Sequence, residues 1–135
     1  MESVSRIRQG GCLCGAVRYE VEGDPEISGL CHCTICRKLT GSVVSVTAHW
    51  RVEKFSMTGM LATYDKRQFC PSCGSRLFFM GSDMVEVFLG SLDDAPNGIM
   101  PQLEVWSIRR EQWLPKIDTI PVHDHDPPPE ALEER

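Results

Sequence analysis

The seven cysteines of this chain fall into three tight groups, and this arrangement limits its fold more than any other feature. Two groups are close pairs, Cys12-Leu13-Cys14 and Cys70-Pro71-Ser72-Cys73, and the third places Cys31, Cys33 and Cys36 within six residues. A structural zinc takes four protein ligands, whereas a reactive zinc takes three and leaves one position for water or substrate. Seven thiols therefore predict one closed metal site and one open site.

The grouping of the thiols follows from their local sequence. Each close pair lies in a glycine-rich turn, and the run from Phe69 to Gly74 has the form of a zinc knuckle. We therefore predict one site from the two pairs and a second site from the compact group of three. Two alternatives stay open: Cys31 and Cys33 complete the knuckle, or a histidine, His32 or His49, closes the three-thiol group as a second structural site.

Composition restricts the classes of function. A length of 135 residues, with 41% hydrophobic and 24% charged residues, suits one globular domain. The net charge of −5 argues against nucleic-acid or anionic-membrane binding. No apolar run is long enough for a membrane span, and residues 1–9 lack the apolar segment of a secretory signal, so we expect a cytoplasmic protein. A reducing compartment and an odd number of thiols favour metal over disulfides.

Alternating apolar residues predict a chain of short strands. We expect strands over 16–22, 42–50, 55–58, 61–65, 66–69, 77–80, 84–89 and 102–107. Thr34 is the expected N-cap of a short helical turn that carries Cys36 and ends near Gly41. The expected organisation is a lead over residues 1–9, a zinc domain over 10–120 and a mobile Pro-rich, acidic tail over 121–135.

Four motifs together resemble the glutathione-dependent formaldehyde-activating enzyme (GFA) family, which is related to centromere protein V. They are Gly-Gly-Cys12-Leu-Cys14-Gly-Ala-Val-Arg-Tyr, Cys31-His-Cys33-Thr-Ile-Cys36-Arg-Lys-Leu-Thr-Gly, Phe-Cys70-Pro-Ser-Cys73-Gly and Gly90-Ser-Leu-Asp-Asp94. The resemblance runs from about Gly10 to Trp113. One position departs from it, because the family often carries a histidine where this chain has Glu104.

The resemblance implies a mostly-β, zinc-stabilised "tent" fold, also seen in certain zinc-containing Rab-binding proteins. It implies two zinc ions per chain, a structural one on Cys12, Cys14, Cys70 and Cys73 and a functional one on Cys31, Cys33 and Cys36. The family reaction joins glutathione to formaldehyde and is classed as a carbon-sulfur lyase reaction. The partners implied here are therefore a small thiol and an aldehyde or related electrophile.

Arg37 and Lys38 directly follow the third thiol group and are candidate substrate-binding residues. Their positive charges can offset the negative charge of three thiolates or bind the carboxylates of glutathione. Such residues are also the ordinary composition of an exposed polar face. The alternative function is a zinc-stabilised binding module without catalysis, which would bind a protein partner.

Overall fold

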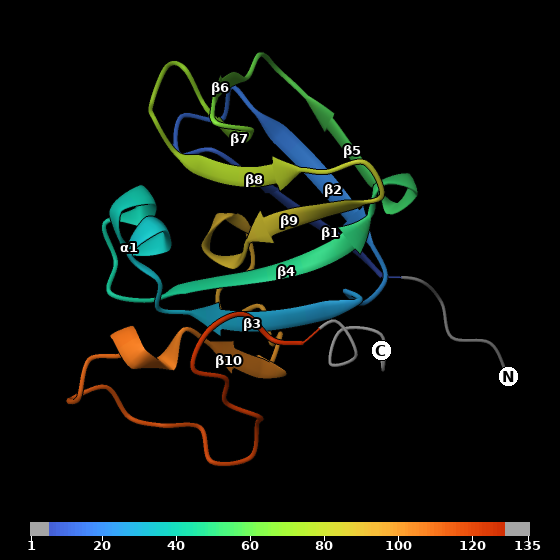
Figure 1. Ribbon diagram of the computed structural model, residues 1–135. Helices are drawn as coiled ribbons and strands as arrows, with labels where there is room; N and C mark the ends of the chain where they lie inside the picture. The colour runs from blue at the N-terminus through green and yellow to red at the C-terminus, as the bar shows by residue number, and fades with distance from the viewer. Residues whose placement is uncertain (1–5, 129–135) are drawn as a thin grey trace, which may run out of the picture. The chain divides into compact units, whose positions relative to one another are not determined.

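The computed structural model describes residues 6–128 and is mostly β, which confirms the predicted fold class (Figure 1). One α-helix, α1, lies among these residues, and none of their helices is long and apolar enough to cross a membrane. The elements are β1 Ile7–Gly11, β2 Arg18–Glu22, β3 Ile27–Cys31, α1 Thr34–Thr40, β4 Ser45–Arg51, η1 Val52–Lys54, β5 Phe55–Thr58, β6 Ala62–Tyr64, β7 Arg67–Phe69, β8 Arg76–Met80, β9 Met84–Phe88, η2 Leu89–Ser91, β10 Leu103–Val105 and η3 Ser107–Arg109.

The chain divides into two compact units, each built from two separate stretches of sequence. Unit 1 contains the described residues up to 26 together with residues 48–98, and unit 2 contains residues 27–47 together with the described residues from 99 onward. Strand β4 begins in unit 2 and ends in unit 1. Each unit holds one of the predicted thiol groups, so each is described separately.

Unit 1 has an aromatic and aliphatic core beneath antiparallel strands. Strand β2 pairs with β1 and β5, and the end of β4 is followed in sheet order by β9, β8, β7 and β6. The alternation predicted for β2 is confirmed, because Val17, Tyr19 and Val21 are all buried. The Tyr19 ring stacks on Phe55 and meets the edge of Phe78, which adds directional aromatic contacts to the burial.

The segment after β9 is hydrogen-bonded to β2 in unit 1. Tyr19 shares a hydrogen bond of 2.6 Å with Ser91, and Arg18 donates two hydrogen bonds to the carboxylate of Asp93. Gly10 lies between them, where an added Cβ would come within 2.5 Å of the Tyr19 ring. Only glycine fits such a close approach. The Gly-Gly and Gly-Ser-Leu-Asp motifs therefore hold unit 1 together.

Unit 2 has a more polar interior. Strands β3 and β10 are parallel, with Cys31 opposite Val105, and sheet order places β3 between β10 and the start of β4. Two apolar residues of this unit, Ile27 and Leu103, are among its buried residues, together with five polar ones: Ser28, His32, Ser45, Thr47 and Glu104. Hydrophobic burial therefore contributes less here than in unit 1.

Helix α1 follows the first two thiols of its group. Its N-cap is Cys33, whose sulfur accepts a hydrogen bond from the backbone N–H of Cys36, so the expectation of a Thr34 cap was wrong by one residue. A thiolate or thiol can accept this bond as a serine oxygen does. The helix ends as predicted at Gly41, whose φ of 74° suits glycine.

Residues 121–126 run beside β10 in unit 2. The backbone N–H of His123 donates to the carbonyl of Glu104, that of Glu104 donates to the carbonyl of Pro121, and Val122 forms an isolated parallel bridge with Glu104. These residues belong to the stretch for which the sequence predicts a mobile tail, and here the backbone groups of Pro121, His123 and His125 form hydrogen bonds. The last part of that stretch, residues 129–135, lies outside the described residues.

Candidate metal centres

The four thiols of unit 1 come from two turns that close on one another. Cys12, Cys14, Cys70 and Cys73 have sulfur atoms that all lie within 4.8 Å of each other. The Sγ atom of Cys14 is 3.6 Å from that of Cys12 and 3.7 Å from that of Cys70. Sulfurs at the corners of a tetrahedron with zinc bonds of about 2.3 Å lie roughly 3.8 Å apart. The donors therefore fit a zinc ion.

Backbone groups and a serine support these sulfurs. The N–H of Val17 points at Cys12, and the N–H groups of Ser72 and Cys73 point at Cys70. The hydroxyl of Ser75, with its backbone, lowers the pKa of Cys73 to about 5. Such donors favour the thiolate form that binds metal.

Crowding has the opposite effect on another thiol of this group. The backbone of Ala16 lowers the pKa of Cys14, but neighbouring Cys12, burial and the remaining thiols together raise it to about 11. Thiolates packed so closely repel one another, and a cation among them relieves that repulsion.

The three thiols of unit 2 form the second group. Cys31 ends β3, Cys33 caps α1, and Cys36 lies in the first turn of the helix, so their sulfurs also fall within 4.8 Å of one another. All three are half-buried. Contact with Cys36, followed by burial, raises the pKa of Cys31. Within residues 6–128, the structure forms two cysteine clusters that can hold metal, as predicted.

The two histidines considered as a fourth ligand are not part of either cluster of the described chain. His49 belongs to unit 1, where its Nε2 lies 3.3 Å from the carboxylate of Glu86. His32 lies between two of the thiols in sequence and is completely buried. Its Nε2 is 3.4 Å from Oε1 of Glu104.

Glu104 and Arg110 are buried together with His32 in a polar cluster that sequence reasoning did not find. The Nε atom of Arg110 lies 3.3 Å from Oε2 of Glu104, and their side chains are 8% and 3% exposed. The sequence singled out Glu104 only as a departure from a family pattern. No local signal indicates this contact, because Glu104 is far along the chain from His32.

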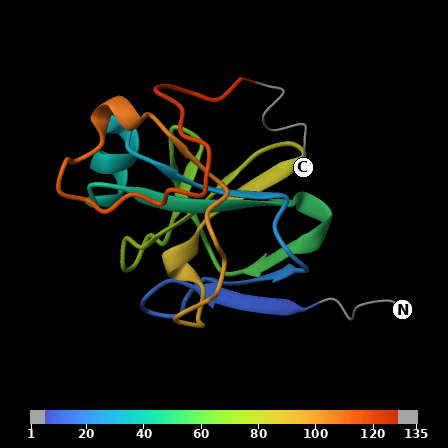
Figure 2. The ribbon, with the colours of Figure 1, turned by 90° about the horizontal axis from the view of Figure 1, so that it is seen from below.

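The two candidate substrate-binding cations differ in their surroundings. The guanidinium of Arg37 donates to the carbonyl of Arg109 at 3.0 Å and to the carboxylate of Glu111 at 2.6 Å. The Ser107–Arg109 turn lies below α1 in Figure 1 and overlaps it in the view of Figure 2, so both lie at the same end of unit 2. Lys38 is exposed and forms no ion pair with the described residues. Its ammonium is therefore the more accessible charge.

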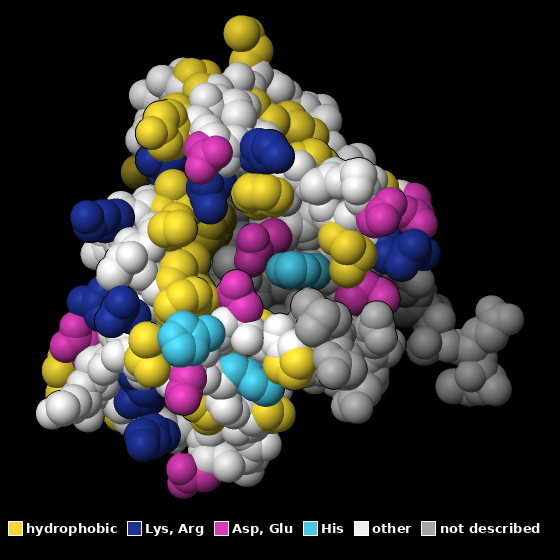
Figure 3. Space-filling view, viewed as in Figure 1, with side chains coloured by type: hydrophobic (Ala, Val, Ile, Leu, Met, Phe, Trp, Pro, Cys, Tyr) yellow, Lys and Arg dark blue, Asp and Glu magenta, His cyan; other side chains and the backbone are white. Residues whose placement is uncertain are grey.

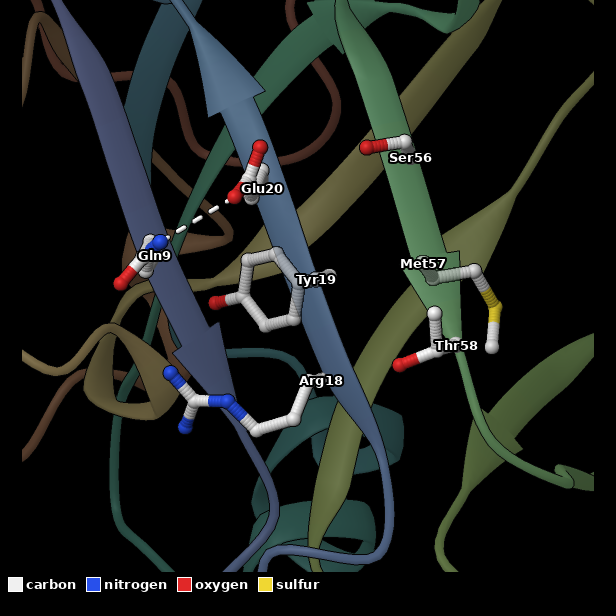
Figure 4. A pocket seen from close by; sticks show the side chains of 7 residues that line it. All are labelled: Gln9, Arg18, Tyr19, Glu20, Ser56, Met57 and Thr58. Carbon is white, nitrogen blue, oxygen red and sulfur yellow. Dashed lines mark hydrogen bonds between the residues drawn. The ribbon is translucent and has the colours of Figure 1, made fainter.

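Two of the surface pockets formed by the described residues lie in unit 1, and neither of these is lined by a cysteine. One, of about 340 Å³, lies over β1, β2 and β5, where Gln9 is hydrogen-bonded to Glu20 (Figure 4). The other, of about 330 Å³, is lined by residues that include His49 and Glu86. On the face in Figure 3, basic side chains lie among acidic and apolar ones and form no continuous patch among the described residues.

Comparison with known proteins decides the family. The family model described as "Glutathione-dependent formaldehyde-activating enzyme" matches residues 7–109, which include both thiol clusters. The chain belongs to this family. It is also 30% identical over 108 residues to a Halomonas elongata protein named "Putative glutathione-dependent formaldehyde-activating enzyme", an alignment that covers 66% of this chain and 68% of that protein. The resemblance inferred from the motifs is thus confirmed.

Proposed function

We propose that this GFA-family chain is a zinc-dependent carbon-sulfur lyase that joins a small thiol such as glutathione to formaldehyde or a related electrophile. The observation that carries the proposal is the half-buried cluster of three thiols in a chain that holds its four other thiols in a separate cluster. Three protein ligands leave a coordination position for substrate, whereas four do not. We infer two zinc ions per chain, one in each cluster.

The reaction balances without an oxidant or reductant. The sulfur of the thiol attacks the aldehyde carbon, a carbon-sulfur bond forms, and the proton of the thiol ends on the former carbonyl oxygen. Cys31, Cys33 and Cys36 would hold the zinc ion, which would supply a Lewis acid for a thiolate or a carbonyl oxygen.

The residues around this cluster have separate proposed roles. The exposed Lys38 is placed to attract a carboxylate of glutathione, and its positive charge offsets the negative charge of the thiolates. Arg37 is a second candidate for this role, although it already holds Glu111. All seven cysteines are free thiols, which fits the reducing cytoplasm as the proposed location.

Replacement of Cys33 by serine tests the proposal without removing the helix cap. Serine is a favoured N-cap, so Cys33→Ser keeps an acceptor for the N–H of Cys36 while it removes one metal ligand. We expect wild-type protein to hold two zinc ions per chain and the variant one. Turnover, followed by NMR as exchange between glutathione and its hydroxymethyl adduct, should fall by at least about a hundredfold, with circular dichroism unchanged.

Thr34→Ala is the matched control, because Thr34 is the exposed neighbour of Cys33 and is not a proposed ligand. Unchanged turnover in Cys33→Ser would contradict the proposal. So would a single zinc in wild-type protein whose thiols are shown by mass spectrometry to be unoxidised. Two zinc ions without turnover would instead favour the binding module.

A further inference from the structure

We propose that Glu104 is a positioning residue that holds the Cys31–Cys33 loop in the geometry its metal requires. This inference rests on the proposed metal site in unit 2. It concerns the retention of metal rather than the chemistry of the reaction, and Glu104 is not proposed to touch the substrate.

Burial shows that Glu104 is built into the interior of unit 2. Its side chain is 3% exposed, that of His32 is 0% exposed, and that of Arg110 is 8% exposed. Its two carboxylate oxygens face different partners, Oε1 the imidazole of His32 and Oε2 the guanidinium of Arg110. A buried carboxylate needs such partners, because burial removes its hydration. Glu104 is therefore the centre of this group.

The backbone links Glu104 to the thiol loop. Strands β3 and β10 place Leu30 opposite Glu104 and Cys31 opposite Val105. One residue further on, the N–H of His32 donates to the carbonyl of Val105 at 3.2 Å. The backbone of the loop is therefore still hydrogen-bonded to β10 where it leaves β3. The contact between the side chains of His32 and Glu104 is a second attachment of the same loop.

Arg110 extends this support to the segment that follows η3. Its guanidinium donates to the carbonyls of Leu114 and Pro115 at 2.5 and 2.6 Å. From the other side, Arg37 of α1 holds Arg109 and Glu111. The segment is thus fastened both to the helix that carries Cys36 and, through Glu104, to the loop that carries Cys31 and Cys33.

Loss of the carboxylate should disturb this loop specifically. Neither ring nitrogen of His32 has a hydrogen-bond partner among the described residues, so its close contact with Glu104 is the interaction that orients it. Glu104→Gln keeps the size of the side chain but leaves Arg110 and His32 without a charge between them. Removal of groups that orient a metal site from outside typically weakens metal binding ten- to a hundredfold.

The experiment measures the release of zinc from wild-type protein and from Glu104→Gln, Glu104→Ala and Glu104→Asp, with a chromogenic chelator. Cys33→Ser should release zinc in a single phase, from the four-thiol site. The additional phase of the wild-type protein is then the release of zinc from the three-thiol site. We expect Glu104→Gln and Glu104→Ala to accelerate the three-thiol phase by about ten- to a hundredfold and to leave the other phase unchanged. Glu104→Asp, which keeps the charge, should remain closer to wild type. Cobalt substitution gives a second readout, because its absorption bands report the geometry of the three-thiol site.

Glu86→Gln is the matched control, because Glu86 lies 3.3 Å from a histidine, close to the 3.4 Å between Glu104 and His32, but is half-exposed in unit 1. Equal acceleration of both phases, or no change in either for Glu104→Gln and Glu104→Ala, would overturn the inference. Two bound zinc ions with a selective effect of Glu104→Gln but no turnover would sustain it and reject the proposed function. A single zinc in unoxidised wild-type protein would reject both.

Discussion

At the scale of single residues, Arg18 and Asp93 show how a surface pair can matter to unit 1. The guanidinium donates to both carboxylate oxygens, although the side chains are 42% and 45% exposed. These hydrogen bonds lower the pKa of Asp93, a shift that its partial burial opposes and that the charge of Arg18 reinforces. Paired geometry of this kind lies at the upper end of what exposed ion pairs contribute, about 1 kcal/mol.

Asp93→Asn should therefore reduce the free energy of unfolding by about 0.5 to 1 kcal/mol at pH 7. The folded-state pKa of Asp93 is lowered, so its stabilising effect is present above the pKa of the unfolded chain and is lost as pH falls through the folded value. Urea midpoints of variant and wild type should differ most at pH 7 and approach each other as pH is lowered below the unfolded-state pKa of the carboxyl.

Asp94→Asn is the control, because the neighbouring Asp94 makes one contact of 3.3 Å with Arg6 and is 68% exposed. It should cost less than Asp93→Asn at pH 7. An equal cost for both variants at pH 7, or a difference at Asp93 that does not shrink as pH falls, would show that the paired hydrogen bonds are not the cause.

The residues of the site differ in how far the sequence could predict them. The spacing of the cysteines in the sequence indicates metal ligands, so both clusters could be predicted from the chain alone. The contact of Glu104 with His32 depends on the parallel pairing of β3 with β10, which joins segments about seventy residues apart in sequence. An isolated glutamate carries no local signal of burial.

At the scale of elements, the predicted strands lie where side chains alternate clearly. Strands β2, β5, β8 and β9 match their predictions closely, because local pattern and burial agree. The sequence does not predict strands β1 and β3, since β1 contains two glycines and polar residues and β3 contains Ser28 and Gly29 in place of an apolar alternation. Pairing with β2 and β10 stabilises them, and tertiary context outweighs weak propensity.

Helix α1 presents its two consecutive cations differently. Residues one apart on a helix point about 100° away from each other, so Arg37 meets the Ser107–Arg109 turn while Lys38 is exposed. We expect Lys38→Met to raise the KM for glutathione several-fold with little change in stability.

Arg37→Met should lower the free energy of unfolding by about 1 kcal/mol through lost hydrogen bonds to charged groups.

Glu111→Gln separates the two possible roles of Arg37. It removes the partner charge of Arg37 but leaves the guanidinium free for a substrate carboxylate. If Arg37 only holds the turn, Glu111→Gln and Arg37→Met will destabilise the protein similarly, and the double variant will be little worse than either. A higher KM in Arg37→Met alone would identify Arg37 as a second substrate-binding residue.

At the scale of the whole molecule, the two units should depend unequally on metal. Unit 1 has a core of aromatic and aliphatic residues, whereas many of the buried residues of unit 2 are polar and α1 has none that is buried. A unit with little hydrophobic burial gains a larger share of its stability from a bound ion. Glu104 and Arg110 connect the segments of unit 2, but their contact with His32 forms only when the Cys31–Cys33 loop is in place.

Partial chelation should therefore loosen unit 2 before unit 1. Hydrogen exchange, measured after removal of the more labile zinc, should accelerate in residues 27–47 and 99–128 while the core strands of unit 1 stay protected. Zinc present at a free concentration of about 100 times its Kd slows exchange through unfolding of its unit by about a hundredfold. Removal of the ion should therefore accelerate exchange in unit 2 by about the same factor. Cys33→Ser should resemble the partly chelated protein and respond no further at this chelator concentration. Equal loss of protection in both units would mean that they unfold as one, and that the polar interior of unit 2 does not make it the more dependent on metal.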